Sequence, residues 1–168
     1  MELHLVHYNS KYGDIGEAVA HEDGLAVIGI LYSLTSGTKS SSSLQPLLDV
    51  VAKVPYPQNN AGLGQSLSLK SLLPSNPETF YRYMGSLTTP GCNEIVTWSV
   101  IQQTVKITES ELETLRSLWD SDGNKLGNNY RFVGLYCIDI FLVSEVIVIV
   151  LCSCRIIHDF YELRLVSL

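Results

Sequence analysis

Few side chains in this sequence have a type and a spacing that could support chemistry. A histidine lies in the strand-like segment Glu2–Tyr8, where Glu2, His4 and Val6 share one face because successive strand residues point to opposite faces. An imidazole so placed can bind a metal ion, although a single strand histidine is more often an ordinary half-buried residue. The second candidate is the Thr88-Thr89-Pro90 turn, whose hydroxyls can serve a site or only satisfy the local backbone.

Several common catalytic signatures are absent from the sequence. There is no glycine-rich phosphate loop, dinucleotide-binding fingerprint, G-x-S-x-G elbow or paired cysteine–histidine nucleophile. The net charge of -6, with 17 acidic against 11 basic side chains, argues against nucleic-acid binding. With 46% hydrophobic and 17% charged residues, the chain is expected to fold rather than to remain disordered.

The elements that would position these residues are mainly strands. Alternation or continuous apolar runs predict strands at Glu2–Tyr8, Leu25–Tyr32 and Glu94–Ile101. Helical spacing predicts a helix over Leu44–Val54, and a capping box with its N-cap at Thr108 predicts the start of another. The apolar stripe of this second helix would consist of Leu112, Leu115, Leu118 and Trp119. We therefore predict a sheet-dominated α+β fold with short surface helices.

The composition changes abruptly after Arg131. Of the 37 residues from 132 to 168, 26 are apolar, against 51 of the first 131, so we treat residues 1–131 and 132–168 as separate parts. The second part is long enough to cross a bilayer, but Asp139 and Glu145 lie within it, and a charge at mid-membrane costs about 2.5–3.5 kcal/mol. We favour a misjoined or translated non-coding segment over a membrane-associated tail, a disordered tail or a genuine core strand.

Four stretches of residues 1–131 are informative together. They are E-L-H-L-V-H-Y-N at 2–9, D-G-L-A-V-I-G at 23–29, Y-R-Y-M-G-S-L-T-T-P-G-C-N-E-I-V-T-W at 81–98 and N-Y-R at 129–131. In this order and at this spacing they resemble the α-class carbonic anhydrases, and the third stretch is the most diagnostic. The resemblance implies that residues 1–131 are the carboxyl-terminal part of that family's domain, which is built on a large, mostly antiparallel twisted β-sheet.

The resemblance also implies a function and a set of site residues. The family's activity is that of a zinc-dependent carbonate dehydratase, a lyase that reversibly hydrates carbon dioxide to bicarbonate. By position, His4 matches the third zinc ligand, Glu2 the carboxylate that orients a ligand imidazole, and Thr88 the hydroxyl that accepts the proton of zinc-bound hydroxide. The residues that match the wall of the carbon dioxide pocket are Val6, Val27, Leu87, Thr89, Val96 and Trp98.

The sequence departs from the family at its other zinc ligands. The first two ligands form a His-x-His pair on a strand before the Glu2 position, and this sequence contains no such pair. Its remaining histidines are His7, on the strand face opposite His4, His21 in a loop and His158 in the tail. Because a zinc site needs three or four protein ligands, we expect this chain to bind zinc weakly or not at all and to be inactive. The competing hypotheses are a non-catalytic carbonic anhydrase-related binding module and a gene-model fragment without a function.

Cys92 bears on localisation through the same resemblance. In secreted members of the family, the cysteine at this position pairs with one near the amino terminus. The resemblance therefore suggests a secreted or extracellular parent, although this sequence shows no signal peptide and a cytoplasmic location stays open. Without the partner, Cys92 would be a free thiol or a small buried hydrophobic residue.

Overall fold

The computed structural model describes residues 1–37, 43–64, 66–126, 129 and 148–153. The chain divides into two compact units. The first comprises Met1–Glu2, Tyr32–Leu73 and Val105–Val148. The second comprises Leu3–Leu31, Pro74–Thr104 and Ile149–Leu168. Most of the residues proposed for the site belong to the second unit.

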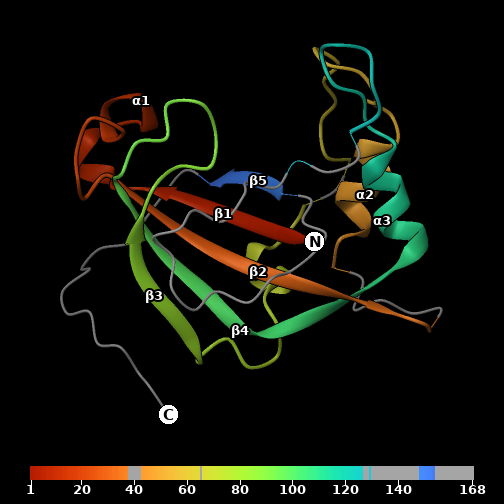
Figure 1. The fold of residues 1–168 in the computed structure, drawn as a ribbon, viewed down its shortest axis with the longest axis horizontal. Coiled ribbons are helices and arrows are strands. Elements are labelled where there is room, and N and C mark those ends of the chain that lie inside the picture. Colours follow the sequence, from red (N-terminus) through yellow and green to blue (C-terminus); the bar gives the residue numbers. More distant parts are fainter. Residues whose placement is uncertain (38–42, 65, 127–128, 130–147, 154–168) are drawn as a thin grey trace. The chain divides into compact units, whose positions relative to one another are not determined.

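The described residues form one sheet with the strand order β3-β4-β2-β1-β5 (Figure 1). Its strands are β1 (Glu2–Tyr8), β2 (Leu25–Thr35), β3 (Phe80–Gly85), β4 (Val96–Thr108) and β5 (Val148–Ser153). The helices are short: α1 (Ile15–Ala18), α2 (Gln45–Val51) and α3 (Glu109–Arg116), with 3-10 turns η1 (Ser10–Tyr12) and η2 (Leu69–Leu72). The predicted sheet-dominated α+β class is therefore confirmed.

The strands agree with the sequence pattern where apolar alternation is strong. β1 has the predicted bounds, and β2 begins at the predicted Leu25 but ends at Thr35 rather than at Tyr32. β4 begins at Val96 rather than at the predicted Glu94, and it runs past its predicted end at Ile101 to Thr108, through the exposed polar residues 102–104. β3 was not predicted, because its residues alternate between half-buried and exposed rather than between buried and exposed. Its antiparallel pairing with β4, which sets Tyr83 opposite Trp98, defines it instead.

The first unit contains the packed pair of helices α2 and α3. Their buried side chains are Leu47 and Leu48 on α2 and Leu112 and Leu115 on α3. The predicted capping box is confirmed: the Glu111 backbone N–H donates to Thr108 Oγ1 at 3.3 Å, and the Thr108 backbone N–H donates to Glu111 Oε2 at 2.8 Å. Two backbone donors at the helix start are thereby satisfied.

The predicted apolar stripe of α3 is wrong at its second half. The helix ends at Arg116, so Leu118 and Trp119 lie outside it. The backbone N–H of Trp119 donates to the Pro55 carbonyl at 2.8 Å, and the Leu118 carbonyl accepts from the Leu126 N–H at 2.6 Å. The bond to Pro55, in a distant segment, and the local bond to Leu126 take the place of bonds that would have continued the helix.

Candidate functional site

The site is centred on His4, which lies in the middle of β1. Its side chain is 3% exposed. The imidazole meets the indole of Trp98, on β4, edge to face, with ring centroids 4.7 Å apart and ring planes at 73°. Such T-shaped pairs are favourable because the positive edge of one ring faces the negative face of the other. His4 is therefore packed against a residue that is far away in the sequence.

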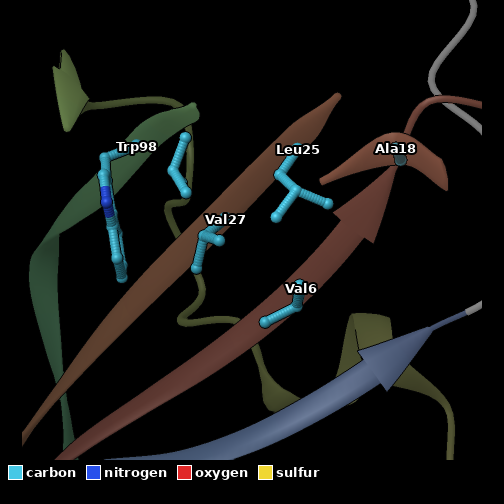
Figure 2. Close-up of a cluster of buried hydrophobic side chains, with 6 residues drawn as sticks. Val6, Ala18, Leu25, Val27 and Trp98 are labelled. Atoms are coloured by element: carbon cyan, nitrogen blue, oxygen red, sulfur yellow. The ribbon is translucent and has the colours of Figure 1, made fainter. Parts of the chain in front are cut away.

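Trp98 also belongs to a cluster of buried apolar side chains. Figure 2 shows members of the cluster projecting from β1, β2 and β4, together with Ala18 at the end of α1. Four predicted pocket residues belong to its buried part, and Leu87 packs against it as a half-buried neighbour. The buried members are Val6, Ala18, Leu25, Val27, Val96 and Trp98. The structure thus brings together five of the six residues predicted for the carbon dioxide wall.

The turn that follows Leu87 carries the two candidate hydroxyl groups. Thr88 and Thr89 are both exposed and are not part of the apolar cluster. The turn is closed by the Cys92 backbone N–H, which donates to the Thr89 carbonyl at 3.1 Å. Gly91 has φ +106°, a conformation that glycine adopts without the strain other residues would suffer. Thr89, the sixth predicted wall residue, therefore lies at the exposed side of the site.

Two side-chain hydrogen bonds that the sequence analysis did not predict hold the loop between β3 and β4. The Trp98 indole Nε1 donates to the Ser86 carbonyl at 3.1 Å. The side-chain amide of Asn93 donates to the Val19 carbonyl at 3.3 Å, across 74 residues of sequence. The Asn93 carbonyl also accepts from the Leu87 N–H at 3.0 Å. The sequence offers one signal for the bond from Trp98, because a buried indole N–H requires an acceptor.

The connection between β1 and β2 is built around Asp23. Its carboxylate accepts hydrogen bonds from the Lys11 ammonium and the Tyr12 hydroxyl. These two bonds hold the pKa of Asp23 below its ordinary value, with Lys11 as the larger cause, and Asp23 in turn raises the pKa of Lys11. The Asn9 backbone N–H donates to the Gly24 carbonyl at 2.8 Å, which closes the connection. This network fixes the end of the strand that carries His4.

The other candidate metal ligands do not converge on His4 in the described part of the chain. Glu2 is half-buried at the start of β1. His7 lies on the opposite strand face, and its buried Nδ1 has no hydrogen-bond partner among the described residues. The His21 ring stacks on Tyr12 at 3.9 Å between centroids. Among the residues that the structure describes, no group of three or more His, Cys, Asp or Glu side chains could hold a metal ion, and His158 lies outside these residues.

Comparison with known proteins identifies the family. The family model described as eukaryotic-type carbonic anhydrase matches residues 1–134. The chain belongs to this family. Carbonic anhydrase 6 of Bos taurus is 37% identical over 135 residues, which cover 78% of this chain and 41% of the relative. Carbonic anhydrase 7 of Mus musculus is 41% identical over 118 residues, 70% of this chain and 43% of the relative. Putative carbonic anhydrase 5 of Caenorhabditis elegans is 35% identical over 130 residues, 77% of this chain and 41% of the relative.

This carbonic anhydrase chain spans about two fifths of the length of these relatives. The matched range contains His4, the apolar cluster and the Thr88 turn, whereas β5 lies beyond it. The division of the chain into residues 1–131 and 132–168 stays a prediction. No helix within the described residues is long and apolar enough to cross a membrane.

Proposed function

We propose that this chain provides one zinc-binding imidazole and the apolar wall of a carbonic anhydrase active site. In a protein with the complete ligand set, that site reversibly hydrates carbon dioxide to bicarbonate. The observation that carries the proposal is the placement of His4 against Trp98, beside the cluster that contains Val6, Val27 and Val96. Membership in the family supports it, because the matched relatives are named carbonic anhydrases.

The chemistry of the cluster suits carbon dioxide as the substrate. Carbon dioxide is small, uncharged and without a dipole, so an apolar surface holds it without the charged groups that an ionic substrate would need. The buried members of the cluster are valine, leucine and alanine side chains together with the indole of Trp98. In this proposal Thr88 supplies a hydroxyl and Thr89 a polar rim at the exposed side of the same wall.

The residues of this chain do not by themselves fit a zinc ion. The site needs at least three protein ligands, and the described residues contain no group of three His, Cys, Asp or Glu side chains that could hold a metal ion. Glu2, two positions before it on β1, is proposed to orient a ligand imidazole, as carboxylates beside zinc-binding histidines do. We therefore propose that the 168-residue chain binds zinc weakly and has no hydration activity until two further imidazoles are supplied.

Zinc content and carbon dioxide hydration of the 168-residue chain test this proposal together. After dialysis against zinc and then against buffer, we expect well below one zinc per chain and no acceleration above the buffer rate. Mouse carbonic anhydrase 7, prepared in parallel, serves as the positive control. One tightly held zinc per chain with measurable hydration would contradict the proposed inactivity. The role of His4 is tested separately in that relative, where alanine at the aligned histidine should abolish both zinc binding and hydration.

A second candidate function is a non-catalytic carbonic anhydrase-related binding or interaction module. The lack of a three-ligand group in the described residues favours it. The coding sequence upstream of Met1 separates the two candidates. A His-x-His pair encoded there in frame would support the enzyme, and an upstream strand without histidines would support the binding module.

Cys92 supports a secreted or extracellular parent. Its thiol is exposed and free in the described part of the chain, so it is available for a disulfide with a cysteine of a longer protein. Relatives differ in compartment, since one of them is named carbonic anhydrase 5A, mitochondrial, of Homo sapiens. Mass spectrometry of the native protein from its source would show whether Cys92 is oxidised.

A further inference from the structure

The sequence contains two Asp-Gly pairs, Asp23-Gly24 and Asp122-Gly123, and no Asn-Gly pair. An Asp-Gly pair is chemically reactive, because the backbone nitrogen of the glycine can attack the side-chain carboxyl carbon of the aspartate. Glycine favours this reaction, since it has no Cβ atom to crowd the nitrogen and it adopts backbone conformations that other residues avoid. The two pairs have the same residue types, so a difference in reactivity between them has to come from the fold.

The fold restrains both reacting groups of the Asp23-Gly24 pair. One carboxylate oxygen of Asp23 accepts a hydrogen bond from the Lys11 ammonium, and the other accepts one from the Tyr12 hydroxyl. The Gly24 backbone N–H donates to the His21 carbonyl at 3.0 Å, and Gly24 itself is buried. These bonds have to open before the nitrogen can reach the carboxyl carbon, so each of them slows the reaction.

The Asp122-Gly123 pair lies in an open turn. Residues 121–125 are all exposed, and no atom apart from those of the chain neighbours lies within 4 Å of a Cβ added to Gly123. In the described part of the chain, no hydrogen bond or ion pair holds the Asp122 carboxylate. The Gly123 N–H donates to the Asp120 carbonyl at 3.3 Å, a longer bond than the corresponding one of the first pair. The reacting groups of this second pair are therefore less restrained.

We propose that Asp122 is a modification site at which aspartate converts to isoaspartate through a succinimide ring, and that the fold protects Asp23 from the same change. The Gly123 nitrogen bonds to the Asp122 carboxyl carbon and gives up its proton, while the bond from that carbon to its hydroxyl oxygen breaks, so that one water molecule leaves. Water then opens the ring. Opening at the side-chain carbonyl restores aspartate, whereas opening at the backbone carbonyl gives isoaspartate, in which the main chain runs through the former side chain.

Protonation adds to the protection of Asp23. The carboxyl group has to be protonated for its oxygen to leave as water. The Lys11 ammonium, and after it the Tyr12 hydroxyl, holds the pKa of Asp23 below its ordinary value. The reactive protonated form of Asp23 is therefore rarer in the folded chain than in an unfolded one at the same pH.

Conversion at Asp122 would alter the turn that closes the bridge between Trp119 and Lys125. In this turn, Asp120 Oδ1 accepts from the backbone N–H groups of Asp122 and Asn124 at 2.9 and 2.8 Å. Isoaspartate adds one carbon atom to the main chain between these two donors. The turn cannot then keep both bonds unchanged.

Ageing of the unmodified 168-residue chain in heavy-oxygen water at neutral pH is the first test. Each ring opening takes one oxygen atom from the solvent, so mass spectrometry detects the passage through the ring. A protease that cleaves before aspartate does not cut at isoaspartate, which identifies the product. We expect labelled isoaspartate to accumulate at Asp122 about tenfold or more faster than at Asp23. Comparable rates at the two positions, or no isoaspartate at Asp122, would overturn the proposal.

Ageing of the same chain in urea is the matched control, because unfolding removes the bonds that hold Asp23. We expect the rates at the two positions to become about equal, chiefly through faster conversion of Asp23. A preference for Asp122 that stays unchanged in urea would show that the fold does not protect Asp23.

Asp122→Glu in the full chain identifies the reacting residue. The tryptic peptide of residues 117–125 also contains Asp120, so the variant separates the two aspartates. Glutamate keeps the charge at this exposed position but would have to form a larger, less favourable ring. We expect no labelled product in this peptide and unchanged conversion at Asp23. Equal labelling of the parent and variant peptides would overturn the assignment to Asp122, and neither zinc nor hydration activity enters any of these measurements.

Discussion

The imidazole of His4 stands edge-on to the indole of Trp98, with 4.7 Å between ring centroids and 73° between ring planes. The same indole donates to the Ser86 carbonyl at 3.1 Å, in the loop that leads to Thr88. Trp98 thus connects the candidate ligand on β1 with the loop that carries the candidate hydroxyl. Both contacts lie within the second unit of the chain.

Substitutions of Trp98 should therefore destabilise the chain, and the loss of stability should grow with the amount of side chain removed. Trp98→Phe removes the indole N–H and part of the ring, and we expect it to lower the free energy of unfolding by about 1–3 kcal/mol. Trp98→Ala should cost about 3–5 kcal/mol, because it leaves a cavity in the cluster. Denaturant unfolding measures both values. Trp119→Phe, at a half-buried tryptophan outside the cluster, is the control, and an equal loss there would argue against a special role for Trp98.

Gly24 should not accept a side chain. A Cβ atom at this position would lie 1.8 Å from the Ala18 carbonyl oxygen, which is backbone and cannot rotate away. We expect Gly24→Ala to lower the free energy of unfolding by about 3 kcal/mol or more, as substitutions that force backbone shifts do. Gly62→Ala is the matched control, because no atom lies within 4 Å of its added Cβ. Similar thermal midpoints for the two variants would show that the Gly24 contact relaxes easily.

The network at Asp23 should make stability depend on pH in the acid range. The pKa of Asp23 is lowered in the folded chain, first by the Lys11 ammonium and then by the Tyr12 hydroxyl. Its contribution is therefore present above the ordinary aspartate pKa of about 3.9 and is lost as the pH falls through the lowered folded value.

Asp23→Asn should accordingly be less stable than the parent at pH 7, with the difference shrinking toward pH 3. The effect should be modest, because the Lys11–Asp23 pair is largely exposed and is screened by water and salt. Denaturant midpoints across this pH range provide the measurement, and Glu22→Gln, at the exposed neighbour, is the control. A difference that stays constant down to pH 3 would mean that the carboxylate charge is not what stabilises the connection.

The start of α3 should depend on its capping box. Thr108→Ala removes the hydroxyl that accepts from the Glu111 N–H and should cost about 1 kcal/mol of unfolding free energy. Ser110→Ala, two residues after the N-cap in the first turn of the same helix and exposed, should be neutral or slightly stabilising because alanine has the higher helix propensity. Thermal unfolding compares the two variants, and a larger loss for Ser110→Ala would contradict this account of the helix start.

Much of the local structure could be predicted from neighbouring residues. The alternation in Glu2–Tyr8 placed His4 and Val6 on one face, and the capping-box spacing located the start of α3 at Thr108. Both signals are local, because they depend on backbone geometry over a few residues. The family could also be recognised, because its diagnostic residues are contiguous in the sequence between 81 and 98.

Tertiary structure decided which strands and loops contact one another. The contact of His4 with Trp98 and the bond from Asn93 to Val19 join distant segments, and no local pattern encodes them. The end of α3 depends on Trp119 bonding to Pro55, and the bounds of β3 depend on its pairing with β4. The sequence by itself determined the candidate ligand, the candidate hydroxyl and the strands that carry the apolar wall. Only the order of strands in the sheet, set by long-range pairing and burial, placed β5 beside β1 and Trp98 against His4.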